Sequence, residues 1–330
     1  MIEAEQLTKR YGPVTAVDHL TFTAGPGHVT GFLGPNGAGK TTTVRILATM
    51  LAPDGGTAWV LGHDVVTGAD AVRRRVALAG QAATVDDDLT GPENLILLGR
   101  LAGLSRRAAR ARAAELLAGF GLEKPAGRQV KTYSGGMRRR LDLAASLIVP
   151  AEVYFLDEPT TGLDPASRAQ IHQIVRALAA GGATVLLTTQ YLDEADELAA
   201  QIAVIDHGRV VAEGTPTELK ASVGAGTLRI RLIDPAQLAE ARRMLSSLLG
   251  VPVLPGPDPA LLTARVPAGS PGQPASGRVT TALAALADAG IPVGEFALGQ
   301  PSLDEVFLTL TGNGRVGSAA SNDSANEAAR

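Results

Sequence analysis

The chain has 330 residues, of which 45% are hydrophobic and 3% are aromatic. This length suggests about two domains with a substantial buried core. The formal net charge of −3 gives no sign of a nucleic-acid partner, and the absence of cysteine excludes disulfides and thiolate metal sites. The five histidines lie far apart, so the sequence indicates no metal site formed by the protein alone.

The sequence also gives an expectation about location. The first residues, 1–5, lack a basic region followed by an apolar core, so no secretory signal is indicated. The apolar stretch 143–151 is interrupted by Ser146 and Pro150 well before it reaches membrane-spanning length. We therefore expect a cytosolic chain, and if it works at a membrane another chain must supply the span.

The first segment of the chain, 2–33, alternates apolar and polar residues around turn signals, which predicts a small antiparallel layer. Tyr11 lies in one of these turns. An aromatic residue at this place could stack on an adenine ring, or it could pack at the edge of a sheet. The sequence leaves both interpretations open.

A glycine-rich stretch follows the apolar strand 29–33 and leads into a helical pattern at 44–50. Its backbone N–H groups and the positive end of the following helix would form a hollow suited to a polyphosphate. Lys40 would place its charge on the β and γ phosphates, and the Thr41 hydroxyl is where a Mg²⁺ ligand belongs. The alternative is a glycine-rich turn with an exposed lysine, but the flanking strand and helix favour phosphate binding. The candidate residues are Gly34, Pro35, Asn36, Gly37, Ala38, Gly39, Lys40, Thr41 and Thr42.

The next segments change from strand to helix. A short apolar strand, 76–79, leads to Gln81, whose amide could reach a nucleotide's metal ion or its attacking water. Two amphipathic helices are predicted at 92–101 and 106–117. The second helix carries several arginines, which we interpret as a solvated helix face rather than as a nucleic-acid contact.

A second anion site is indicated by Ser134, Gly135 and Gly136, because they precede another helix. The same residues could form only a helix cap. The apolar strand 153–158 then ends in two carboxylates that should point in different directions. Asp157 would hold Mg²⁺, and Glu158 would polarise the water that attacks the γ-phosphate. The alternative is a strand end with two solvated acids.

In this order and spacing, the motifs resemble those of the nucleotide-binding subunit of an ABC transporter. The resemblance covers residues 1 to roughly 222 and implies binding of ATP and Mg²⁺. It implies an α/β fold: an ABC-type P-loop ATPase domain, with a mixed sheet core, an antiparallel β subdomain and a helical subdomain, followed by a small α+β domain. The matching segments are 34–42 as Walker A, Gln81 as the Q-loop, 134–137 as the signature motif, 153–158 as Walker B and 161–164 as the D-loop.

The resemblance also implies a homodimer in which the cassettes are arranged head to tail. Ser134 and Gly136 of one subunit would then meet the ATP held by Lys40 of the other, and Asp164 of the D-loop would belong to the same nucleotide site. Two residues depart from the family pattern. Met137 replaces the usual glutamine of the signature motif, and Gln190, after the strand 184–188, replaces the usual histidine of the switch.

Gln190 can hydrogen-bond a γ-phosphate, but it cannot carry a positive charge or titrate near neutral pH. This favours Glu158 as the catalytic base over a mechanism centred on a histidine.

Further segments resemble the daunorubicin/doxorubicin-resistance ATP-binding proteins of actinobacterial exporters, which share Met137 and Gln190. These segments are 54–57, 133–142, 188–196 and 302–308. The resemblance implies a separate integral membrane permease, export of a small hydrophobic, anthracycline-like drug, and a peripheral location at the cytoplasmic face of the cell membrane.

We expect three parts: a cassette at 1–222, an α+β accessory or dimerisation domain at 223–312, and a disordered tail at 313–330. Within the second part the pattern alternates strands and helices in a way compatible with a ferredoxin-like sandwich. No catalytic constellation appears there. A last helix, 303–310, is expected to dock on the cassette.

Three other functions are alternatives to drug export. Soluble ABC-type ATPases of DNA repair or translation usually carry coiled-coil insertions, zinc sites or a second cassette, and this chain has none of these features. A P-loop kinase or GTPase would leave the segment 134–136 unexplained. The same motor with a lipid, polyketide or peptide as cargo remains open, because cargo is read mostly by the permease.

Overall fold

The computed structural model describes residues 1–80, 85–222, 225–256, 258–267, 275–299 and 302–310. The chain divides into two compact units, Met1–Pro216 and Thr217–Arg330. No helix in the described ranges is both long and apolar enough to cross a membrane. The predicted tail, 313–330, lies outside the described residues.

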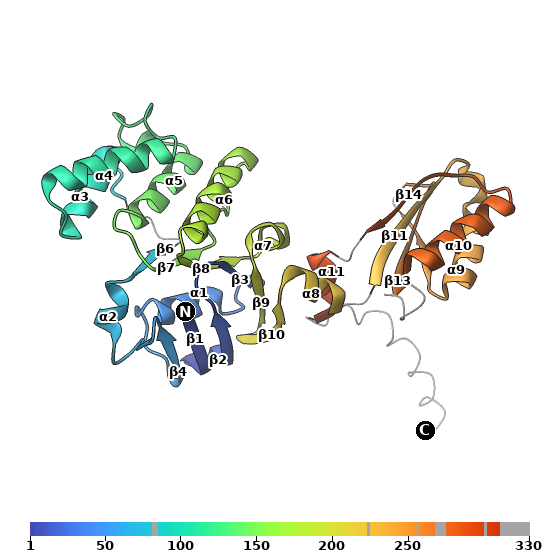
Figure 1. Cartoon of the computed structure of the whole chain (residues 1–330), viewed down its shortest axis with the longest axis horizontal. Coiled ribbons are helices and arrows are strands. Elements are labelled where there is room, and N and C mark those ends of the chain that lie inside the picture. The colour runs from blue at the N-terminus through green and yellow to red at the C-terminus, as the bar shows by residue number, and fades with distance from the viewer. Residues whose placement is uncertain (81–84, 223–224, 257, 268–274, 300–301, 311–330) are drawn as a thin grey trace, which may run out of the picture. The chain divides into compact units, whose positions relative to one another are not determined.

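A six-stranded mixed sheet forms the centre of the first unit (Figure 1). The strands from β9 to β6 run parallel, and β10 is antiparallel at one edge. The three central strands are buried along their whole length, which explains their mainly apolar sequences. They all end at one edge of the sheet, so the residues that follow them converge. The strand order is β10 (Arg209–Gly214), β9 (Gln201–Asp206), β3 (Val29–Leu33), β8 (Thr184–Thr189), β7 (Val153–Asp157) and β6 (Val76–Ala79).

An antiparallel sheet packs beside this central sheet, as the alternation at the start of the chain predicts. Its core is shared with β3 and helix α1 (Lys40–Leu47), and the rings of Phe22 and Phe32 lie 4.9 Å apart there. The hairpin of β1 and β2 is therefore fixed against the strand that leads into the glycine-rich loop. The strand order is β2 (Val14–Ala24), β1 (Ile2–Tyr11), β4 (Gly55–Val60) and β5 (His63–Asp64).

A helical layer forms the rest of the first unit, and Figure 1 shows α3, α4 and α5 grouped together away from β1, β2 and β4. Thr90 starts α3 with a reciprocal capping box to Glu93. Leu95, Leu117 and Leu141 join the helices in one core. The helices are α2 (Ala69–Arg73), α3 (Gly91–Leu101), α4 (Arg106–Gly119), α5 (Gly135–Ser146), α6 (Pro165–Ala180) and α7 (Leu192–Leu198), with a 3₁₀ turn at Val130–Thr132.

The second unit has the βαββαβ order of the predicted ferredoxin-like sandwich, with an antiparallel sheet ordered β12-β13-β11-β14. The sequence pattern did not predict β12, which is short and begins after Pro252. Proline is tolerated in such an edge strand. The elements are α8 (Pro216–Ser222), β11 (Ala225–Leu232), a 3₁₀ turn (Pro235–Gln237), α9 (Leu238–Leu249), β12 (Val253–Pro255), β13 (Leu261–Pro267), α10 (Ala275–Asp288), β14 (Val293–Gly299) and α11 (Leu303–Leu310).

Candidate functional site

A cavity of about 540 Å³ opens at the start of α1, beside the ends of β7 and β8. Most of its wall consists of residues that the sequence singled out, joined by Ala16 and Thr161. The structure thus brings together segments that are far apart in the chain. The predicted residues on the wall are Tyr11, Asn36, Gly37, Gly39, Lys40, Thr41, Thr42, Glu158 and Gln190.

The glycines of the loop 34–39 are required by its shape. Gly39 precedes α1 with a φ of 101°, and a Cβ atom there would lie 2.3 Å from the carbonyl oxygen of Ala16. A Cβ atom on Gly34 would lie equally close, at 2.3 Å, to the carbonyl oxygen of Ile205. Any side chain at either position would displace the main chain. The loop therefore continues directly into α1, and the backbone N–H groups at this helix start favour a bound anion.

Lys40 lines this cavity, although its side chain is only 4% exposed. Its Nζ donates to the carbonyl oxygens of Gly34, at 2.7 Å, and Pro35, at 3.0 Å. The Glu158 carboxylate lies 3.3 Å away. A buried ammonium group needs such partners, and each of them comes from a segment that was predicted to contact nucleotide.

The two carboxylates at the end of β7 occupy different environments. Asp157 is 3% exposed and accepts a hydrogen bond of 2.6 Å from the Thr188 hydroxyl. Glu158 has a φ of 49°, so the chain turns sharply after the strand and the carboxylate of Glu158 reaches the cavity wall. The main-chain N–H of Glu158 donates to Thr188 on β8, and the Thr161 hydroxyl donates to Oε2 of Glu158 at 3.3 Å. Asp157 is not part of the cavity wall.

The chemistry of the available donors fits Mg²⁺. The described residues contain no cluster of three or more acidic, histidine or cysteine side chains that would hold a metal ion alone. Mg²⁺ is commonly bound by one or two carboxylates together with substrate phosphates. Asp157 supplies such a carboxylate, and the hydroxyl of Thr41 on the cavity wall is a further oxygen donor. When bound, the ion would neutralise charge on the phosphates.

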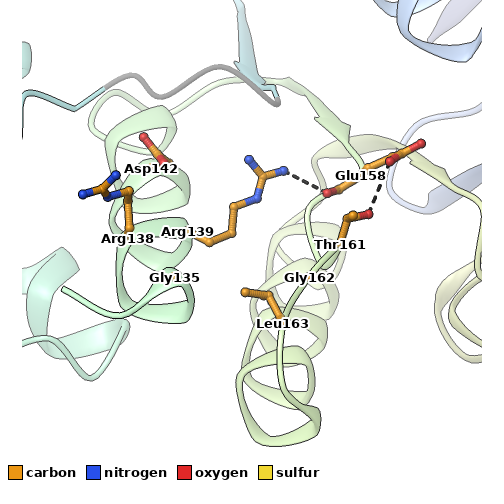
Figure 2. A pocket seen from close by; sticks show the side chains of 8 residues that line it. All are labelled: Gly135, Arg138, Arg139, Asp142, Glu158, Thr161, Gly162 and Leu163. Carbon is orange, nitrogen blue, oxygen red and sulfur yellow. Dashed lines mark hydrogen bonds between the residues drawn. The ribbon is translucent and has the colours of Figure 1, made fainter. Parts of the chain in front are cut away.

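A second cavity, of about 440 Å³, lies between α5 and the segment that follows β7 (Figure 2). Arg138, Arg139 and Asp142 line it from α5, and Figure 2 shows Arg139 reaching toward Glu158. Glu158 and Thr161 line both cavities. Glu158 therefore stands between the glycine-rich loop and the signature segment of the same chain.

The signature segment, 134–137, also stabilises the start of α5. Ser134 is the N-cap residue and accepts a hydrogen bond of 3.3 Å from the N–H of Met137. The Met137 side chain packs on the helical core, which gives a physical reason for an apolar residue in place of glutamine. A Cβ atom on Gly136 would lie 2.8 Å from the Ser167 hydroxyl, so this glycine permits close packing against α6. The contact with nucleotide stays a prediction for Ser134, Gly135 and Gly136.

The other predicted residues include a helix cap, an exposed aromatic side chain and a buried alanine. Asp164 caps α6, and hydrogen bonds from the N–H and hydroxyl of Ser167 lower the pKa of its carboxyl. Tyr11 ends β1 and is 46% exposed at the cavity wall, with Nζ of Lys9 6.0 Å from the ring centroid. Ala38 is buried, and Gln81 lies outside the described residues.

The sequence did not reveal a buried polar network behind the site. The Thr160 hydroxyl donates to Glu194 at 2.8 Å, and Nε2 of His172 lies 3.3 Å from the same carboxylate. Nδ1 of His172 lies 3.0 Å from Glu197. This network ties the segment after Glu158 to α7, which follows Gln190. Each of these contacts joins residues more than twenty positions apart in the chain, so no local pattern signals the network.

Comparison with known proteins decides the family. The ABC transporter family model matches residues 17–161. The chain is 58% identical to the daunorubicin/doxorubicin resistance ATP-binding protein of Streptomyces peucetius over 312 aligned residues. The alignment covers 94% of this chain and 92% of that protein. The chain belongs to the ABC transporter family. The predicted family is thus confirmed, and the first unit is an ABC ATPase cassette that binds ATP and drives transport.

Two solved structures agree with this assignment. The ATP-binding subunit of an ABC transporter superposes with a TM-score of 0.62 at 27% identity, over 68% of this chain and 93% of that chain. A dimeric bacterial ABC transporter cassette gives a TM-score of 0.60 at 25% identity, over 65% of this chain and 98% of that chain. The predicted α/β cassette fold is therefore confirmed.

Proposed function

We propose that this cassette powers the export of a hydrophobic, anthracycline-like antibiotic through a separate membrane permease. The observation that carries the proposal is the 58% identity to a daunorubicin/doxorubicin resistance ATP-binding protein, which extends over both units of the chain. The chain would act at the cytoplasmic face of the membrane as a peripheral subunit, because the permease supplies the span.

The cavity at the start of α1 would receive the ATP phosphates. The N–H groups of the loop 34–39 and the Lys40 ammonium would bind the β and γ phosphates, and Tyr11 would stack on the adenine. Thr41 and Asp157 would hold Mg²⁺, with Gln81 as a further contact. The roles of Tyr11, Lys40 and Thr41 are supported by their common cavity wall, and that of Asp157 by its burial beside this wall at the end of β7.

Glu158 would act as the general base in hydrolysis. The oxygen of a water molecule attacks the γ-phosphorus, the bond from that phosphorus to the bridging oxygen of ADP breaks, and the water's proton passes to the Glu158 carboxylate. Gln190 would hydrogen-bond the γ-phosphate or the water from the end of β8. The position of both side chains on the same cavity wall supports this assignment.

Two cassettes would close head to tail on ATP. In this dimer the backbone N–H groups of Gly135 and Gly136, with the Ser134 hydroxyl, would contact the γ-phosphate held by the partner's loop, and Asp164 would lie at the same interface. The glycine-rich start of α5 supports this role, because a helix N-terminus favours an anion. The second unit, without a catalytic constellation, would stabilise the dimer.

Accumulation of a fluorescent anthracycline in cells tests this proposal. Cells would express the neighbouring permease together with either the wild-type chain or Glu158→Gln, at matched protein levels. We expect lower accumulation with the wild type alone. Equal accumulation in both, with ATPase activity confirmed on the purified wild type, would retain the motor and reject the drug as its cargo.

A further inference from the structure

Arg139 connects the signature helix to the main chain that carries the two carboxylates at the end of β7, Asp157 and Glu158. It lies on α5, five residues after Ser134, and extends toward the end of β7 (Figure 2). Its guanidinium donates to the carbonyl oxygens of Asp157 at 3.1 Å, Glu158 at 2.9 Å and Pro159 at 3.0 Å. It also donates to the carbonyl oxygen of Gly80, at 2.5 Å, just beyond β6.

This set of contacts is unusual for an arginine on a helix surface. Burial lowers the pKa of the Arg139 guanidinium, and the charges of Asp142, Asp157 and Glu158 oppose that effect. The four carbonyls that accept these hydrogen bonds belong to the main chain, so Arg139 holds the backbone beside the carboxylates. The five N–H donors of arginine point in fixed directions around a planar group and can reach carbonyls that are spread along the chain, whereas the three donors of lysine all start from one nitrogen atom.

The main chain that Arg139 holds is strained. Glu158 adopts a φ of 49°, in the left-handed region that a residue with a side chain rarely occupies. Such a conformation persists only where its surroundings impose it. Arg139 binds the carbonyls of Asp157, Glu158 and Pro159, which lie before, at and after this turn. Thr188 on β8 also holds the N–H of Glu158, so loss of the Arg139 bonds would loosen the turn and shift the Glu158 carboxylate rather than unfold the segment.

We propose that Arg139 is a positioning residue for ATP hydrolysis: it holds the strained turn at Glu158 and makes the signature helix and the carboxylates one rigid group. The inference rests on the proposed role of Glu158 as the base. It goes beyond that role, because within the described residues the hydrogen bonds of Arg139 reach the site through main-chain carbonyls and not through the glycine-rich loop.

The test compares hydrolysis with ATP binding in the purified full-length chain. Arg139→Met removes every one of the hydrogen bonds while keeping a long side chain. We expect kcat to fall by roughly 100-fold, since displacement of a catalytic group by about 1 Å costs this much. The Kd for ATP should stay within about two-fold, because Lys40 and the loop are untouched. Arg139→Lys keeps the positive charge and one nitrogen donor group. Its kcat should lie between those of the wild type and Arg139→Met, with roughly a 10-fold loss.

Arg112→Met is the matched control. Arg112 also extends from the helical layer and donates to a main-chain carbonyl, that of Leu147 at 2.9 Å, but it does not contact the segment after β7. The control loses the same charge and a comparable bond, so its kcat should stay near the wild-type value. Thermal unfolding of both variants reports any general loss of stability.

The outcomes separate this inference from the proposed function. A reduced kcat at unchanged Kd in Arg139→Met, with Arg139→Lys intermediate and Arg112→Met normal, supports it. If Arg139→Met hydrolyses ATP with the wild-type kcat, or if Arg112→Met loses as much kcat as Arg139→Met, the inference is overturned and the role of Glu158 stays intact. A wild-type chain that does not hydrolyse ATP overturns the proposed function and this inference with it.

Discussion

The two units differ in what they bury. Among the described residues, every buried polar or charged side chain belongs to the first unit, including Lys40, Asp157, Glu158 and Thr188. The core of the second unit is formed by leucine, isoleucine, valine and alanine alone, such as Leu228 and Leu245. Burying a polar group costs free energy unless it is hydrogen-bonded. The first unit buries such groups at the proposed ATP site, whereas the described core of the second unit contains aliphatic side chains instead.

Backbone strain follows the same division. The non-glycine residues with positive φ in the described chain, Glu158 among them, all lie in the first unit. In the described part of the second unit, positive φ occurs only at Gly250 and Gly290, and glycine adopts it at little cost. Strain of this kind is concentrated at functional sites. The comparison predicts that substitutions at the nucleotide cavity of the first unit change ATP binding or hydrolysis, whereas core substitutions in the second unit change its stability alone.

The largest effect is expected for Lys40→Ala. It removes the only lysine on the cavity wall that the structure describes, and we expect ATP binding to weaken by at least about 100-fold. Equilibrium binding of a labelled nucleotide measures this change. Lys131→Ala is the control, because Lys131 pairs with Asp88 on the surface and its loss should leave the Kd unchanged. Binding by Lys40→Ala with the wild-type Kd would contradict the phosphate site.

A smaller effect is expected for Gln190→His. The wild-type ATPase should show no pH inflection near ~6.5 attributable to this position, because an amide does not titrate there. The variant should gain such an inflection and keep activity within about three-fold of the wild type, or exceed it. Steady-state ATPase rates between pH 5.5 and 8.5 test this prediction. Complete loss of activity would show that Gln190 is more than a substitute for histidine.

The smallest effect on catalysis is expected for Leu245→Ala in the second unit. Leu245 is 1% exposed, so its truncation should lower the free energy of unfolding of that unit by about 2–5 kcal/mol. Denaturant titration measures this loss. The ATPase rate below the unfolding transition should stay within about two-fold of the wild type. A lost ATPase with the first unit still folded would show that the second unit takes part in catalysis and would break the comparison.

Much of the site is predictable because its motifs are local. The loop at 34–42 lies between a buried strand and a helix, and this context alone indicates a phosphate site. Parallel strands end at a common edge, so the convergence of Glu158 and Gln190 follows from the strand pattern. The structure places both on one cavity wall with Lys40.

The remaining features depend on contacts between distant segments. The sequence shows Arg139 as one of three consecutive arginines, and only the packing of α5 against β7 directs it to the carbonyls beside Glu158. The positive φ of Glu158 has no sequence signal, since residues with side chains rarely adopt it. The same holds for His172, whose carboxylate partners lie on another helix.

Glu158→Gln tests the central claim that the cassette hydrolyses ATP with Glu158 as its base. The amide keeps the shape of the side chain but cannot accept the water's proton. Purified wild type and variant would be compared for ATP affinity, phosphate release and sedimentation in Mg-ATP. We predict an unchanged or tighter Kd, a closed dimer that persists, and phosphate release at least about 100-fold slower than in the wild type. Phosphate release at the wild-type rate would contradict the account and assign the base to another group.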